Sequence, residues 1–142
     1  MWRDAEFVER NREVFEREFD GFLPGEILDF HVHIFNDGVC DPMKPYVCAG
    51  HPIARYDYAD FAKDVEIAYP GRSVKAVCFG SPSPDRDNAR NNAYVAAEAD
   101  PATRFPFRLL DPMKDTAETL RRDVESRDRK STRLNSSHGK LS

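Results

Sequence analysis

Residues 26–34 read Glu26-Ile27-Leu28-Asp29-Phe30-His31-Val32-His33-Ile34, and from Leu28 onward apolar and polar side chains alternate. Successive side chains of a β-strand point to opposite faces, so this alternation predicts a strand with one apolar and one polar face. We expect the apolar face, Leu28, Phe30, Val32 and Ile34, to pack against helices. The polar face, Asp29, His31 and His33, is then expected to point the other way.

The other hydrophobic patterns predict a regular alternation of strands and helices. An amphipathic helix over residues 3–19 precedes three strand–helix units. The predicted strands cover 26–34, 74–79 and 104–110, and the helices that follow them cover 58–69, 88–99 and 115–125. Asp57 is the expected N-cap of the helix 58–69, and the loop 35–55 is long enough to carry function. This order is typical of a parallel α/β sheet with right-handed crossovers.

The composition is that of a soluble protein. The chain has 142 residues, of which 40% are hydrophobic and 32% charged, and it contains no apolar run long enough to span a membrane. Residues 1–10 are charged and lack the apolar core of a secretory signal. We therefore expect a cytoplasmic protein without a membrane partner. The three cysteines, Cys40, Cys48 and Cys78, are odd in number and unpatterned, which favours reduced thiols.

The last residues, 128–142, differ in character from the rest of the chain. They contain no aromatic residue and no periodicity that could bury a face. Residues 128–138 resemble, residue for residue, the in-frame translation of a common sequencing-library adapter. We therefore expect a non-native, disordered tail with Leu134 and Leu141 largely exposed, and we exclude His138 from every metal argument. Basic residues outnumber acidic ones in this tail, so the body is more acidic than the overall net charge of -4, which argues against a nucleic-acid partner.

His31 and His33 are the residues with the strongest chemical signal. Two imidazoles two residues apart on a strand project side by side, and imidazole nitrogen binds Zn²⁺, Mn²⁺, Fe²⁺ and Ni²⁺. The pair ends the first strand of a βα series and precedes a long loop, which is where parallel barrels build active sites. Asp29 is expected to orient the strand end or an imidazole by accepting an N–H bond. The alternative is an ordinary buried histidine bonded to a backbone carbonyl.

Other candidate residues carry weaker signals. His51, Arg55 and Ser81 lie in predicted loops that would rim a pocket, although polar loop residues are more often simply solvated. Asp111 ends the third predicted strand, where it could also form a turn or cap a helix. The spacing of Cys40, Cys48 and His51 does not fit a closed zinc site, so we interpret them as loop residues.

Several stretches resemble one known family. Residues 29–35 are similar to the D-x-H-x-H-x-F signature in the first strand of the amidohydrolase superfamily, in its amidohydrolase-related (amidohydrolase 2) group. Residues 74–79 resemble that family's second strand, and residues 92–95, 100–105 and 110–112 resemble its N-x-Y-V, P-x-R-F and D-P landmarks. The resemblance covers residues 26–125, and only the histidine pair in it is chemically specific.

The resemblance implies a fold and a division of the chain. The chain would be the amino-terminal (βα)₃ portion of a TIM-type (βα)₈ metal-dependent hydrolase barrel, truncated before the later strands. Residues 1–25 would form an amphipathic helix and linker, 26–127 the partial barrel and 128–142 the non-native tail. In the family, further metal ligands follow the fifth, sixth and eighth strands, and those positions are not in this chain.

The resemblance also implies a function for the parent protein. His31 and His33 would bind a divalent metal, Zn²⁺ before Mn²⁺, whose water attacks a small-molecule ester, lactone or amide. The alternatives are a metal-dependent non-oxidative decarboxylase on the same fold, and an H-x-H phosphoesterase, whose threonine after the second histidine is Ile34 here. A third alternative is an inactive fragment, and the expected base lies outside this chain. The sequence does not indicate the oligomeric state.

Overall fold

The structure is a computed structural model that describes residues 3–36, 38–39, 41, 43–48, 50–82 and 86–125. The chain forms two compact units, 1–109 and 110–142. The predicted non-native tail, with Leu134 and Leu141, lies outside the described residues. Within them, no helix has both the length and the apolar character needed to cross a bilayer.

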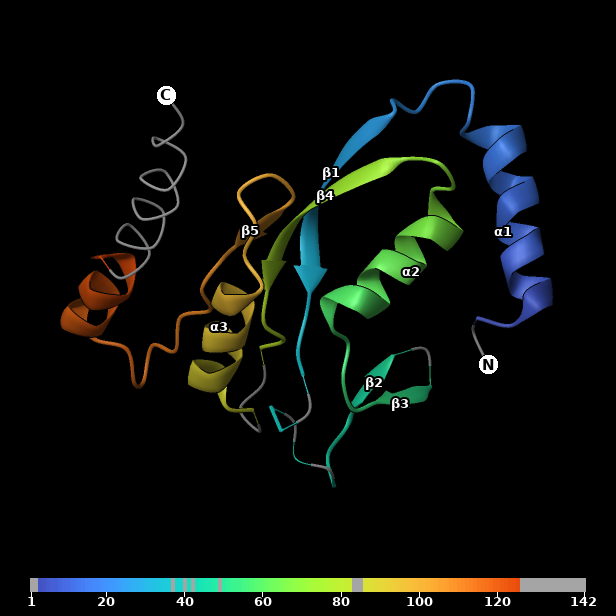
Figure 1. The fold of residues 1–142 in the computed structure, drawn as a ribbon. Helices are drawn as coiled ribbons and strands as arrows, with labels where there is room; N and C mark the ends of the chain where they lie inside the picture. The colour runs from blue at the N-terminus through green and yellow to red at the C-terminus, as the bar shows by residue number, and fades with distance from the viewer. Residues whose placement is uncertain are drawn as a thin grey trace, which may run out of the picture. The chain divides into compact units, whose positions relative to one another are not determined.

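A parallel three-stranded sheet forms the centre of the first unit (Figure 1). Its strands are β1 (Glu26–His33), β4 (Ser73–Phe79) and β5 (Arg104–Pro106), in the order β1-β4-β5. The connections between them contain α2 (Tyr58–Ala68) and α3 (Asn88–Ala97). Both strand pairs are parallel, so the predicted class, a parallel α/β arrangement, is confirmed. β5 is shorter than predicted, and it ends at the proline, which has no N–H to continue the ladder.

Aspartate caps begin the three helices of this unit. Asp4 precedes α1 (Ala5–Glu18), and its side chain accepts a hydrogen bond from Phe7 N. In the same way, the side chain of Asp57 accepts from Asp60 N in α2, and that of Asp87 accepts from Arg90 N in α3. The predicted cap at Asp57 is therefore confirmed, because its side chain satisfies an N–H that the helix itself leaves unpaired. The chain before α1 is attached to α2 by an ion pair of 2.6 Å between Arg3 Nε and Asp64.

The predicted loop 35–55 contains a hairpin that the sequence analysis did not predict. Strands β2 (Tyr46–Cys48) and β3 (His51–Ile53) pair antiparallel within it. Two backbone hydrogen bonds between Phe35 and Tyr56, of 2.8 and 2.9 Å, close the base of the segment. Each strand has only three residues, too few for a period-two pattern to be visible.

The core of the unit lies between the sheet and helices α2 and α3. Val32, Ala76 and Cys78 from the sheet, with Ile34 directly after β1, meet Phe61 from α2 and Val95 from α3. Both helices therefore cover the same face of the sheet, as Figure 1 shows. The opposite face carries no helix of this unit among the described elements.

A β-bulge in β1 changes which residues face this core. Asp29 is the register partner of Ala76, and Val32 is the partner of Cys78, so two residues of β1 face the single residue Val77 between them. An extra residue in one strand shifts the alternation of its side chains by one position. Before the bulge the even-numbered positions 26 and 28 are the exposed ones, whereas after it the even-numbered Val32 is buried and the odd-numbered His33 is half-buried.

The bulge overturns part of the predicted division of faces. Val32 and Ile34 are buried as predicted, but Leu28 and Phe30 are 42% and 70% exposed. Partners in a parallel ladder share a face, so Leu28 lies on the side of its partner Lys75, away from the helices. The prediction that Leu28 and Phe30 pack against helices is therefore wrong.

The second unit contains a helical stretch over residues 117–125, close to the predicted 115–125. Before it, the chain turns at residues 111–115, where the backbone N–H groups of Lys114 and Asp115 donate to Asp111 O.

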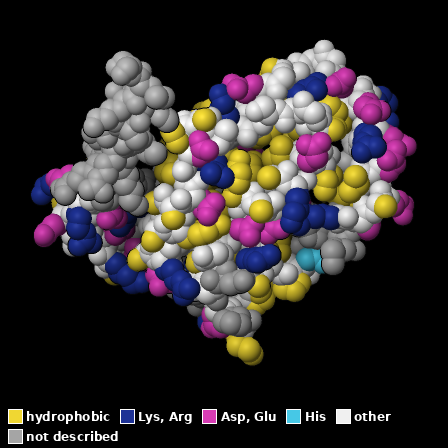
Figure 2. Space-filling view, in the orientation of Figure 1, with side chains coloured by type: hydrophobic (Ala, Val, Ile, Leu, Met, Phe, Trp, Pro, Cys, Tyr) yellow, Lys and Arg dark blue, Asp and Glu magenta, His cyan; other side chains and the backbone are white. Residues whose placement is uncertain are grey.

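The surface of the viewed face carries charges of both signs (Figure 2). Acidic and basic side chains are interspersed there, with acidic groups numerous along the right edge. Hydrophobic side chains reach the surface between them.

Because of the bulge, two substitutions should differ in their effect on the free energy of unfolding. Without the bulge, both side chains would lie on the same face of the strand and both substitutions would be equally destabilising. Ile34→Ala should lower the free energy of unfolding by about 2–5 kcal/mol, because it leaves a cavity in the core. Phe30→Ala should change it by less than about 0.5 kcal/mol, because this ring is largely exposed. Urea unfolding of the two variants checks this. An equally large loss for Phe30→Ala would contradict the bulged register.

Candidate metal site at the end of the first strand

His31 and His33 lie side by side at the carboxyl end of β1. Their Nε2 atoms are 3.1 Å apart, and their ring planes are nearly perpendicular, at 83°. Both side chains therefore point to the same side of the strand, as the alternation predicted for these two residues. His31 is exposed and His33 is half-buried, so the pair is accessible from solvent.

One hydrogen bond fixes the tautomer of His33. Its Nδ1 lies 2.8 Å from the carbonyl oxygen of Gly80, which follows β4. A carbonyl oxygen can only accept, so Nδ1 carries the proton, and in the neutral ring Nε2 keeps a lone pair. Histidines that bind metals through Nε2 commonly donate Nδ1–H to a backbone carbonyl in this way.

The spacing of the two Nε2 atoms fits ligation of one ion. Two nitrogens at about 2.05 Å from Zn²⁺ are roughly 2.9 Å apart at a right angle and roughly 3.3 Å apart at the tetrahedral angle. The observed 3.1 Å lies between these values. The donor atoms are also of the type that Zn²⁺ and Mn²⁺ accept. The arrangement of His31 and His33 is therefore compatible with a shared divalent metal.

The ring of Phe79 holds both imidazoles in place. Its centroid is 4.8 Å from that of His31 and 4.5 Å from that of His33, with edge-on geometry in both cases. Phe79 is the register partner of His33, so its side chain shares the face of the histidine pair. This contact restricts rotation of the two rings and favours the arrangement in which their Nε2 atoms converge.

Asp29 lies on the other face of the strand. Its register partner Ala76 belongs to the helix-covered face, so the prediction that Asp29 shares a face with the histidines is wrong. Its carboxylate accepts a hydrogen bond of 2.9 Å from the backbone N–H of His31. This N–H lies in the bulge, where the ladder is interrupted, so Asp29 supports the backbone at the strand end.

Gly80 allows the chain after β4 to approach α3 closely. A Cβ atom at this position would lie 1.7 Å from Nδ2 of Asn91, which is fully buried. The same side chain donates a hydrogen bond of 3.3 Å to the carbonyl oxygen of Ile34. The residue that accepts the bond from His33 is therefore confined by Asn91.

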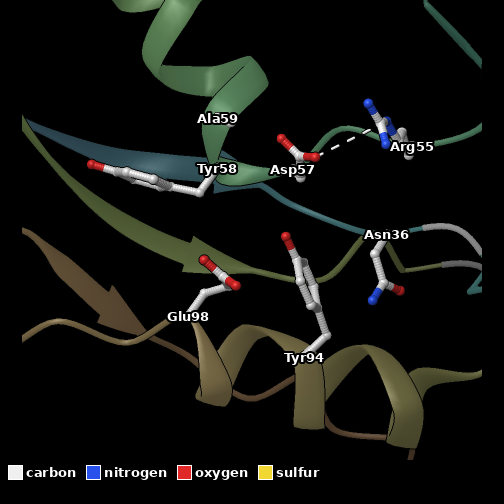
Figure 3. Close-up of a pocket in the computed structure, with 7 residues that line it drawn as sticks. All are labelled: Asn36, Arg55, Asp57, Tyr58, Ala59, Tyr94 and Glu98. Carbon is white, nitrogen blue, oxygen red and sulfur yellow. Dashed lines mark ion pairs between the residues drawn. The ribbon is translucent and has the colours of Figure 1, made fainter.

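Arg55 lines an open depression of about 440 Å³ on the other side of the sheet (Figure 3). The lining residues are Asn36, Arg55, Asp57, Tyr58, Ala59, Tyr94 and Glu98. Tyr58 and Tyr94 pack against the core under the helices, so this depression lies away from the histidine face. Burial raises the pKa of Tyr94, which keeps its phenol protonated.

His51 and Ser81, the other predicted residues in the first unit, do not join the histidine pair. His51 lies opposite Cys48 in the β2–β3 hairpin, and both are exposed. Ser81 is only 4% exposed, which leaves little of it for contact with a substrate. In the second unit, Asp111 accepts a bond from Met113 N, which is the turn-forming role. Cys40 lies outside the described residues.

His31 and His33 are two candidate ligands, and the described residues do not supply a third. Over the described ranges, no three His, Cys, Asp or Glu side chains gather in a group that could hold a metal. Cys78 is in the core on the other face, and burial raises the pKa of its thiol to about 11. It therefore remains a protonated thiol at neutral pH, unsuited to act as a ligand or nucleophile.

The sequence analysis missed Gly80, Phe79 and Asn91. Asn91 precedes Val95 by one helical turn and so shares its buried face, where an amide is unusual; this was an available signal. Gly80 follows a strand directly, a position that can indicate close approach of another backbone or side chain. Phe79 gave no signal, because an aromatic residue in a strand is ordinary.

Comparisons with protein-family models, with curated proteins and with solved structures found no match to this chain. The features described above are therefore the basis for assigning a function.

Gly80→Ala should disturb the site while Gly21→Ala should not. The added methyl group meets Asn91 in the first case and nothing within 4 Å in the second. We expect Gly80→Ala to lower the free energy of unfolding by about 1–3 kcal/mol, the usual cost of overpacking. Gly21→Ala should be neutral within about 0.5 kcal/mol. Urea unfolding measures both, and equal stability of Gly80→Ala and the wild type would disprove the close contact.

Proposed function

We propose that His31 and His33 are two ligands of a divalent metal, Zn²⁺ in preference to Mn²⁺, in a metal-dependent hydrolase. The observation that carries this proposal is the convergence of two Nε2 atoms at 3.1 Å, with Nδ1 of His33 bound to the Gly80 carbonyl. Without a metal, the same 3.1 Å is a hydrogen-bond distance, at which Nε2–H of His31 can donate to the lone pair of His33 Nε2. A divalent ion would take the place of that proton between the two nitrogens. The substrate class is a small-molecule ester, lactone or amide.

When bound, the metal would lower the pKa of a water molecule or polarise a substrate oxygen. The chain's own residues would hold it in place: His33 through the bond to Gly80, and both rings through contact with Phe79. Asp29 would keep the backbone of His31 in position through the bulge. Further ligands and a proton-transferring group would have to come from outside the described residues.

We further propose that the sheet is part of a (βα)₈ barrel of the amidohydrolase-related family. Three features support this proposal. The strands are parallel with helices on one face, the histidines are at the carboxyl end of the first strand, and the opposite face has apolar groups open to solvent. Leu28 and Phe30 on that face would be covered by the interior of a closed barrel.

Zinc binding should depend on both histidines of the pair. Titration calorimetry of the chain with Zn²⁺ should detect a site that His31→Ala and His33→Ala each abolish, because a single imidazole holds the ion too weakly. His51→Ala is the matched control, an exposed histidine in the hairpin, and should leave the titration unchanged. Zinc binding that survives both single substitutions would refute the proposed ligands.

The chain should have no hydrolase activity even when it is loaded with Zn²⁺ or Mn²⁺. Two neutral imidazoles leave the charge and most of the coordination geometry of the ion to water, and no described carboxylate joins them as a base. The assay measures turnover of lactones, amides and aromatic acids, with a complete metal-dependent hydrolase as the reference. Turnover by this chain at a comparable rate would show that its site is complete.

A further inference from the structure

The side-chain amide of Asn91 is fully buried. It contacts the residue directly after β1 and the residue directly after β4. It belongs to α3 and is 0% exposed. Its Nδ2 donates to the carbonyl oxygen of Ile34, directly after β1, at 3.3 Å. The same nitrogen packs so closely on Gly80, directly after β4, that no side chain fits there.

The burial of Asn91 is not explained by packing alone. Its Oδ1 is buried without a hydrogen-bond partner among the described residues. A buried acceptor without a partner is destabilising, and an apolar side chain of similar size would avoid that cost. The amide therefore contributes something that an apolar residue would not, and of its two polar atoms only Nδ2 has a hydrogen-bond partner among the described residues.

Two hydrogen bonds connect the end of β1 to the end of β4, and a third connects Asn91 of α3 to the residue after β1. Ile34 N donates to Phe79 O at 3.0 Å, His33 Nδ1 donates to Gly80 O, and Asn91 Nδ2 donates to Ile34 O. The middle bond determines which nitrogen of His33 carries the proton. The first bond joins the two backbone segments, and the third holds the Ile34 segment, while the Gly80 segment is confined by its close contact with Asn91.

We propose that Asn91 is a positioning residue, which holds Ile34 and Gly80 so that His33 keeps its proton on Nδ1 and presents the Nε2 lone pair. The consequence for metal binding rests on the proposed function, whereas the effect on the tautomer does not.

Asn92 provides a matched control next to Asn91 in the same helix. It is also buried, at 8% exposure, and its amide exchanges two hydrogen bonds of 2.9 Å with the backbone of Leu109. Asn92 therefore anchors the chain after β5. Replacing it removes more hydrogen bonds than replacing Asn91, but none of them involves Ile34 or Gly80.

The first experiment uses the metal-free, ¹⁵N-labelled full chain in mildly alkaline buffer. Long-range ¹H–¹⁵N spectra report which ring nitrogen of His33 is protonated. We expect the Nδ1–H tautomer in the wild type and in Asn92→Ala, and a shift towards Nε2–H in Asn91→Ala. A wild-type tautomer that persists in a folded Asn91→Ala variant, or an equal shift in Asn92→Ala, would overturn the proposal.

Two measurements keep the test decisive if Asn91→Ala is unstable. Protection of the buried Cys78 from thiol reagents reports whether the core is intact, and Asn91→Ser is a milder variant with the same expected shift. In the wild type, the Nδ2 protons of Asn91 should show nuclear Overhauser contacts to Gly80 Hα. Absence of those contacts would also overturn the proposal.

The second experiment separates this inference from the proposed function. Asn91→Ala should weaken Zn²⁺ binding by about 10- to 100-fold, the usual effect of losing a group that orients a ligand, and Asn92→Ala should leave it unchanged. If the wild type binds no Zn²⁺ while the tautomer shifts as expected, the proposed function fails and the role of Asn91 stands. Normal Zn²⁺ affinity in Asn91→Ala would refute that role and leave the proposed ligands intact.

Discussion

The hydrogen bond from His33 Nδ1 to the Gly80 carbonyl is the interaction on which the candidate site depends. It connects a side chain at the end of β1 to the backbone at the end of β4, so it forms only when these strands are in register. The register in turn depends on the core beneath, where Val32 and Cys78 face each other. A local chemical property, the position of one proton, is thus set by tertiary structure.

Much of the fold followed from local patterns in the sequence. The strand β4 and the helices α2 and α3 were predicted to within one or two residues, because hydrophobic periodicity and aspartate caps are short-range signals. The parallel class followed from the order of these elements. The hairpin β2–β3 was not predicted, because strands of three residues carry no such pattern.

The details of the site depended on features that the sequence does not display. The bulge inserts one residue into β1 and moves Asp29 to the face opposite to the prediction, and nothing in the alternation of residues 28–34 marks it. The proximity of His31 and His33 was predictable, since no extra residue is inserted between them. The partners Gly80 and Asn91 are distant in sequence, and their contact arises only from the packing of α3 on the sheet.

The close approach of Gly80 and Asn91 also constrains how this chain can diverge. With Nδ2 of Asn91 at 1.7 Å from where a Cβ would be, the two positions compete for one volume. A descendant could enlarge residue 80 only if residue 91 had first become smaller, and that smaller residue would no longer reach the Ile34 carbonyl. Positions 80 and 91 should therefore change together in evolution. The substitution at position 91 should come first, because a chain with a larger residue 80 beside Asn91 would not fold.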